Sequence, residues 1–135
     1  MKTMLNCVLL IDDSASVNFY NKTLLQQADY CDQIVQTRHG KEALDVLTEQ
    51  VDGHYLRPDL IFLDINMPIM DGWEFLVEYS KLDEKMKGQV LVVLLTSSLN
   101  PEDRKRASKI KEVDDFYNKP IDLDTLSLIM QKHFS

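Results

Sequence analysis

The sequence predicts a three-layer α/β domain, in which helices cover both faces of a parallel sheet. Short apolar runs, clearest at residues 8–11, 60–63 and 90–95, are too short for helices and typical of strands buried on both faces. Helical patterns alternate with these runs, and that order builds parallel sheets with right-handed crossovers. The length of 135 residues fits one domain with its own core. We therefore expect five strands and five helices, with a core over about residues 4–134.

The first part of the chain is expected to form three strands and two helices. The strands are predicted at residues 4–11, 33–37 and 59–64, and the helices at residues 15–28 and 40–50. Ser14 can cap the first helix, in which Val17, Tyr20, Leu24 and Leu25 have nearly the spacing of a core-facing stripe. The second strand is less apolar than the first and is expected near a sheet edge. Residues 51–58 form a loop, with a glycine and a proline as breakers.

The second part of the chain is expected to add three helices and two strands. Asp71 is placed to cap a helix over residues 72–82, and the charged segment 81–89 is expected on the surface. A buried strand follows at residues 90–95. Asn100, Pro101 and two acidic residues then form a strong signal for a helix start. A short strand at residues 115–118 precedes a last helix, capped by Asp122 and running to the C-terminus.

The composition is typical of a globular protein that stays in the cytoplasm. Its 22 acidic residues outnumber the 15 basic ones, and the net charge of −7 argues against a general nucleic-acid binder. No apolar run approaches the ~20 residues of a membrane helix, and the N-terminal run leads into Asp12 and Asp13 without a signal-peptide cleavage site. Cys7 lies in a strand and Cys31 between elements. They form neither a disulfide framework nor a metal knuckle, which suits a reducing compartment.

Polar residues follow or end four of the predicted strands. They are Asp12, Asp13, Asp64, Thr96 and Lys119. In a parallel sheet the carboxyl ends of all strands lie at one edge, which is where open α/β sheets bind ligands. The sequence therefore predicts that these five side chains, far apart along the chain, meet in one cluster.

The predicted cluster has the chemistry of phosphoryl transfer. Its three carboxylates would repel one another unless a cation joins them, and all-oxygen donors of this kind suit Mg²⁺. The hydroxyl of Thr96 and the ammonium group of Lys119 suit phosphoryl oxygens, because such transfer depends on positioning and charge neutralisation. Asp64 is central and is the candidate nucleophile for an acyl phosphate. Asp12 and Asp13 come from a neighbouring strand and can hold the metal.

Four stretches of the sequence resemble the receiver domain of bacterial two-component response regulators. They read LLIDDS at residues 9–14, LDINMPIMDG at 63–72, LLTSS at 94–98 and NKP at 118–120. The resemblance covers essentially the whole chain, in order and at suitable spacing. It implies a flavodoxin-like (βα)5 sandwich with a parallel sheet of order 2-1-3-4-5. It also implies a phosphoacceptor at Asp64, loaded by a histidine kinase or a histidine phosphotransfer protein.

The resemblance implies a magnesium site with specific ligands. Asp13, the Asp64 carboxylate and the backbone carbonyl of Asn66 match the family's ligands, and Asp12 matches the residue that holds the metal through water. Asn66 also occupies a position that influences the rate of dephosphorylation in this family. Ser97 stands where the family usually has alanine or glycine, so access for small phosphodonors and water is expected to be reduced.

The resemblance also implies an output switch. Thr96 and Lys119 match the pair that grips the phosphoryl group, and Phe116 matches an aromatic residue that turns inward as Thr96 moves. Tyr117, beside it, is the alternative aromatic. The face that would change comprises the fourth predicted helix, the fifth strand and the fifth helix. Such a two-state element is biased by a few kcal/mol.

The fourth predicted helix also has a run of basic residues. The run fits either a solvated helix face or a docking surface for an acidic partner. Its members are Arg104, Lys105, Arg106, Lys109 and Lys111.

Other functions are compatible with parts of the pattern. Haloacid dehalogenase-type hydrolases place an aspartate two residues after the nucleophile, where this chain has Asn66, and they use a cap domain that is not predicted here. A receiver-like module that never accepts phosphate usually lacks the acidic pair, the acceptor or the lysine, and all of these are retained here. A flavin carrier needs a phosphate loop rich in serine, threonine and glycine after the first strand, and this chain has no such loop there. The expected protein is a signalling domain rather than an enzyme, without an output domain, and monomeric or weakly dimeric when phosphorylated.

Overall fold

The computed structural model describes residues 4–87 and 91–134 and contains one parallel sheet of five strands. The order β2-β1-β3-β4-β5 confirms the expected sheet. Three of the strands lie in the first half of the chain: β1 (Leu5–Ile11), β2 (Cys31–Thr37) and β3 (Leu60–Asp64). The other two are β4 (Leu91–Thr96) and β5 (Asp115–Asn118).

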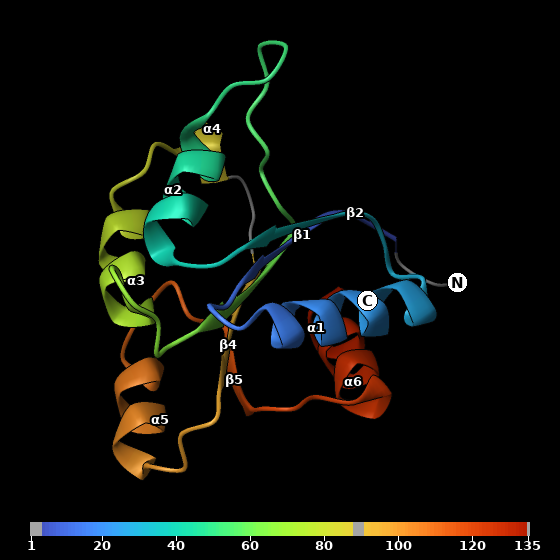
Figure 1. The fold of residues 1–135 in the computed structure, drawn as a ribbon, viewed down its shortest axis with the longest axis vertical. Helices are drawn as coiled ribbons and strands as arrows, with labels where there is room; N and C mark the ends of the chain where they lie inside the picture. Colours follow the sequence, from blue (N-terminus) through green and yellow to red (C-terminus); the bar gives the residue numbers. More distant parts are fainter. Residues whose placement is uncertain (1–3, 88–90, 135) are drawn as a thin grey trace.

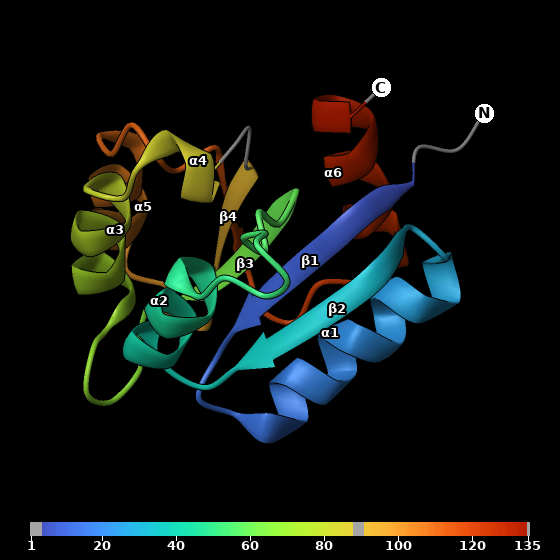
Figure 2. The same ribbon diagram turned by 90° about the horizontal axis from the view of Figure 1, so that it is seen from above.

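Helices cover both faces of the sheet, as predicted for a three-layer sandwich. On one face lie α1 (Ala15–Ala28) and α6 (Leu123–Phe134), and on the other α2 (Gly40–Thr48), α3 (Gly72–Ser80) and α5 (Pro101–Ser108) (Figures 1 and 2). Alternate residues of the central strands point to opposite faces, so the sheet separates two apolar cores. None of the helices among the described residues is long and apolar enough to cross a bilayer.

The charged segment after α3 contains a short helix that the sequence did not predict. This helix, α4, spans Glu84–Lys87 and has no buried residue. Because four residues with no buried side chain form no apolar stripe, the periodicity used to predict helices could not detect this helix. The fourth and fifth predicted helices are therefore α5 and α6. Residues 88–90, including the predicted start of β4, lie outside the described residues.

Strand β2 is an edge strand, as predicted, but it begins two residues earlier than expected. Cys31 therefore lies in β2, paired with Leu5 of β1, and not between elements. Both cysteines are free thiols. Burial, helped by nearby acidic groups, raises the pKa of Cys7 to about 11 and that of Cys31 to about 11. Neither thiol is activated as a nucleophile.

The helix starts agree with the capping signals. The side chains of Ser14, Asp71 and Asn100 accept hydrogen bonds from the first turns of α1, α3 and α5. The start of α2 at Gly40 is also as predicted, although its cap is His39.

The predicted core face of α1 is half wrong. Leu24 and Leu25 are buried, but Val17 is partly exposed and Tyr20 is 42% exposed. Asn18 and Asn21 take the remaining buried positions. An asparagine can be buried where its amide finds hydrogen-bond partners, and Asn18 bonds backbone groups at the ends of β1 and β2. The pattern of apolar residues contains no information on such partners.

Candidate functional site

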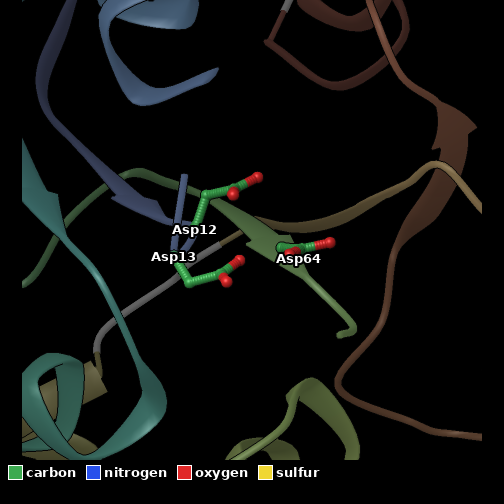
Figure 3. Close-up of side chains that lie close together, drawn as sticks. All are labelled: Asp12, Asp13 and Asp64. Carbon is green, nitrogen blue, oxygen red and sulfur yellow. The ribbon is translucent and has the colours of Figure 1, made fainter. Parts of the chain in front are cut away.

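The parallel sheet brings the predicted acidic residues together at its carboxyl edge. Asp12 and Asp13 directly follow β1, and Asp64 is the last residue of β3, the neighbouring strand. One carboxylate oxygen from each lies within 4.8 Å of the others. Figure 3 shows the three side chains grouped at the ends of these two strands. The convergence expected from the topology is therefore observed for the acidic residues.

Lys119 joins this cluster from the segment after β5. Its Nζ lies 2.9 Å from Oδ2 of Asp12 and 3.2 Å from Oδ1 of Asp64. Both carboxylates are nearly buried, with Asp12 4% and Asp64 5% exposed, whereas Asp13 is exposed. One ammonium group thus bridges two nearly buried carboxylates, and charges removed from water interact more strongly than charges on the surface.

The loop after Asp64 is fixed by the start of α3. The N–H of Gly72 donates to the carbonyl of Ile65 at 2.7 Å. A Cβ at position 72 would lie 2.6 Å from the backbone oxygen of Asp64, so only glycine allows this approach. Asp71 and Glu74 form a capping box at the same helix start. The sequence from Asp71 to Glu74 therefore holds the chain beside Asp64.

The electrostatics of the cluster leave Asp64 poised near neutral pH. Burial, together with the charge of Asp12, raises the pKa of Asp64 from 3.8 to about 6, although Lys119 opposes the increase. Burial alone would lower the pKa of Lys119. Its hydrogen bonds with Asp12 and Asp64, and the negative charges of these two residues, outweigh burial and raise the pKa. The pocket thus contains more negative charge than its single ammonium group neutralises. Three close carboxylates are the oxygen donors that Mg²⁺ prefers, and they fit that ion.

Thr96 and Asn66 lie at the same edge as the acidic residues. Thr96 ends β4 and is fully buried, and its hydroxyl oxygen accepts the N–H of Ser98 at 3.0 Å. Asn66 is exposed, two residues beyond β3. Ser97 is exposed as well. Thr96 and Asn66 therefore lie at or just beyond the carboxyl ends of two adjacent strands, β4 and β3, at the edge of the sheet that carries the acidic cluster.

The two candidate switch aromatics lie on opposite faces of β5. Phe116 is 8% exposed and belongs to the core under α5, where the guanidinium carbon of Arg104 lies 4.7 Å from the centre of its ring. Tyr117 packs against the other core, and its hydroxyl donates to Asp115 at 3.0 Å. Phe116, unlike Tyr117, therefore lies on the face of β5 that α5 covers.

The basic run is divided between a helix and the segment that follows it. Helix α5 ends at Ser108, so Lys109 is its C-cap and Lys111 lies beyond it. Arg106 places its guanidinium carbon 4.4 Å from the centre of the Trp73 ring in α3. Two of the five basic residues therefore stack on aromatic rings, an interaction that is favourable even at exposed sites.

One residue beside the cluster was missed by the sequence analysis. The amide nitrogen of Asn18 donates to the backbone oxygens of Asp12 at 3.0 Å and of Thr37 at 3.1 Å. The only signal in the sequence is that Asn18 follows the cap residue Ser14 by four positions, on the same side of α1.

We expect the stability of the metal-free protein to depend on pH through Asp64. Its pKa is raised in the folded state, so the native protein binds this proton more tightly than the unfolded chain. Stability is therefore lost as the pH rises from about 4 to about 6. Asp64→Asn should be more stable than wild type by between about 2 and 3 kcal/mol above pH 6, and no more stable below pH 4. Urea unfolding in EDTA across this range measures the difference. A difference that does not vary with pH would contradict the raised pKa.

The comparisons with known proteins agree with this geometry. Residues 8–131 match the family described as the response regulator receiver domain. The chain is 27% identical to sporulation initiation phosphotransferase F of Bacillus subtilis, over 93% of this chain and 91% of that protein. It is 32% identical to a protein-glutamate methylesterase/protein-glutamine glutaminase of Syntrophomonas wolfei over 90% of this chain, but it spans only 32% of the length of that relative.

Solved structures show the same similarity. A two component response regulator from Cytophaga hutchinsonii superposes with a TM-score of 0.84 and 34% identity, covering 96% of each chain. The chemotaxis protein CheY4 of Vibrio cholerae has a TM-score of 0.76 and 26% identity, covering 95% of this chain and 98% of its own. The fold is thus flavodoxin-like and similar to that of CheY, and the chain belongs to the response regulator receiver domain family.

Proposed function

We propose that this protein accepts a phosphoryl group on Asp64 in a two-component phosphorelay. The donor is a histidine kinase or a histidine phosphotransfer protein, and Mg²⁺ is the cofactor. The observation that supports this most directly is the meeting of three carboxylates and Lys119 at the ends of three strands. Similarity over nearly full length to a sporulation phosphotransferase supports a relay role.

The proposed reaction moves the phosphoryl group from a nitrogen to an oxygen. A carboxylate oxygen of Asp64 attacks phosphorus, the bond from phosphorus to the donor's imidazole nitrogen breaks, and that nitrogen retains the electron pair. Mg²⁺ would be held by Asp13, Asp64 and the backbone carbonyl of Asn66, with Asp12 acting through water. When bound, it neutralises charge on the phosphoryl oxygens. Lys119, already 3.2 Å from Asp64, supplies the second positive charge.

A direct experiment is phosphorylation by acetyl phosphate followed by intact-mass analysis. Wild-type protein with Mg²⁺ should gain one phosphoryl group, and the adduct should be lost on treatment with hydroxylamine, as expected for an acyl phosphate. Protein treated with EDTA should gain none. If Mg²⁺ made no difference to the gain, the proposed role of the acidic cluster would be wrong.

The proposed output is a change in the face formed by α5, β5 and α6. Thr96 would move toward the phosphoryl group, and Phe116 would follow into the space behind it. Movement of Phe116 separates its ring from Arg104, so one of the contacts that hold α5 is lost. Ala107 is the only buried residue of α5, which makes this helix easy to displace.

Replacement of Thr96 by valine tests this output without removing the phosphoacceptor. In wild type, beryllofluoride with Mg²⁺ should speed amide hydrogen exchange in α5 by at least about threefold, because the helix is weakly anchored. Thr96→Val should still gain the phosphoryl group, but its α5 should exchange at the unloaded rate. Exchange measured by mass spectrometry on peptides covering α5 provides the comparison. An equal response in the variant would exclude Thr96 from the switch.

The protein is proposed to be a signalling domain rather than an enzyme that acts on other substrates. A haloacid dehalogenase-type hydrolase would need an acid at the position of exposed Asn66. A regulator or relay domain, monomeric or weakly dimeric when phosphorylated, fits these observations. Its downstream target is proposed to be a protein that binds the face formed by α5, β5 and α6.

A further inference from the structure

Asn18 lies in the first half of α1, with its carboxamide buried beside the acidic cluster. The residue is 2% exposed. Its amide nitrogen donates to the backbone oxygen of Asp12 at 3.0 Å and to that of Thr37 at 3.1 Å. These oxygens belong to the residue that follows β1 and the last residue of β2. One side chain therefore ties the ends of two neighbouring strands at the edge where the acids meet.

The bonded oxygen of Asp12 is part of the peptide group that joins Asp12 to Asp13. Because this group is planar, fixing the direction of its carbonyl also fixes its N–H and the bond leading to the Cα of Asp13. The N–H of Asp12 donates to the same Thr37 oxygen at 3.1 Å. Both peptide groups that flank Asp12 are thus held against the end of β2.

The two acidic side chains depend on this backbone to different degrees. The carboxylate of Asp12 is held directly, by the N–H of Ser14 at 2.9 Å and by Lys119 at 2.9 Å. Asp13 is exposed, and its carboxylate has no such anchor among the described residues. The placement of its side chain therefore depends more on the peptide group that precedes it. Asn18 bonds that peptide group.

The carboxamide of Asn18 also destabilises the folded protein through one of its atoms. Its Oδ1 is buried and has no hydrogen-bond partner within residues 4–87 and 91–134. An unpaired buried acceptor is unfavourable, and a leucine of similar shape would avoid it. The two bonds donated by Asn18 are therefore better explained by what they position than by a gain in stability.

We propose that Asn18 is a positioning residue for the magnesium site, acting through the peptide group between Asp12 and Asp13. It contacts neither the metal nor the phosphoryl group. The proposal rests on the proposed function, because it assigns Asn18 a part in the same reaction. Groups that orient metal ligands in this way typically affect metal affinity by 10–100-fold when they are replaced.

The test compares Asn18→Leu with Thr37→Val in the absence and presence of phosphodonor. Thr37→Val is the matched control, because it removes another buried hydrogen bond at the same strand ends, from the Thr37 hydroxyl to Leu10, and leaves the Thr37 backbone oxygen in place. Calorimetric titration without phosphodonor gives the dissociation constant for Mg²⁺. Labelling by acetyl phosphate gives the half-saturating Mg²⁺ concentration and the maximal rate.

We expect Asn18→Leu to raise the Mg²⁺ dissociation constant about tenfold, the lower end of the usual range. The half-saturating concentration should rise equally, while the maximal rate at saturating Mg²⁺ stays within about twofold of wild type. Thr37→Val should change none of these values. The serine side chain is too short to bond both carbonyls, so Asn18→Ser should also raise the Mg²⁺ dissociation constant. This variant replaces Asn18→Leu in the test if the leucine variant does not fold.

Each other result would overturn the proposal. Unchanged Mg²⁺ affinity in both Asn18 variants would show that the peptide group is positioned without the amide. A lower maximal rate at an unchanged half-saturating Mg²⁺ concentration would show that Asn18 has a purely structural role, because the variant would then only contain fewer folded molecules. If the wild-type protein did not bind Mg²⁺, the proposed function would be overturned as well. If wild type binds Mg²⁺ and the Asn18 variants bind it equally well, only the role of Asn18 is wrong.

Discussion

Asp64→Asn is expected to abolish phosphorylation by acetyl phosphate. The variant keeps the size and nearly the shape of the side chain, but an amide oxygen is a far weaker nucleophile than a carboxylate. We expect the labelling rate at saturating Mg²⁺ to fall at least about 1,000-fold, as is typical when a nucleophile is removed. Intact-mass analysis over a time course measures the rate.

The matched control for this variant is Asp71→Asn. Asp71 lies in the same loop and caps α3, and asparagine is also a good cap, so the local structure should be kept. Labelling of Asp71→Asn should stay within about threefold of wild type. Equal labelling of Asp64→Asn and Asp71→Asn would show that the phosphoryl group is attached elsewhere, and peptide mapping would then locate it.

Much of the fold and the acidic cluster could be predicted from the sequence, for a physical reason. Strands buried on both faces consist almost entirely of apolar residues, so the apolar runs of β3 and β4 clearly favoured strands. Once the strands are parallel, the positions of Asp12 and Asp64 follow from topology, without any knowledge of side-chain packing. Lys119 reaches the same place because it directly follows β5.

The features that could not be predicted depend on partners that are distant in the sequence. Tyr20 was expected in the core, but its hydroxyl donates to the carbonyl of Ile121, which lets the ring remain partly exposed. Asn18 was overlooked because its two acceptors are backbone oxygens at the ends of two strands, outside its own helix. Arg104 was expected in solvent or against a partner, yet it stacks on Phe116. In each case a polar or charged group contacts a partner that only tertiary structure brings near, which periodicity does not reveal.

Lys119→Met is expected to produce the largest loss of stability in the metal-free protein. Lys119 pairs with two nearly buried carboxylates, and its removal leaves their charges uncompensated. Breaking a buried ion pair from one side costs about 3–5 kcal/mol, and uptake of a proton by Asp64 should reduce this to roughly 3 kcal/mol at pH 7.5. In a chain of this size the melting temperature should fall by roughly 10 °C. Scanning calorimetry in EDTA measures it.

Mg²⁺ should reverse most of this loss, because a divalent cation restores positive charge to the same pocket and binds only the folded state. Lys132→Met is the matched control: its ammonium group pairs with Asp115 at 3.1 Å, but its side chain is 56% exposed. A surface pair of this kind contributes about 0–1 kcal/mol, so the control should melt near wild type in EDTA and gain as much from Mg²⁺ as wild type does. If Lys119→Met and Lys132→Met were destabilised equally, Lys119 would not be compensating buried charge. If Mg²⁺ left Lys119→Met unchanged, the cation would not bind among the carboxylates that Lys119 bridges.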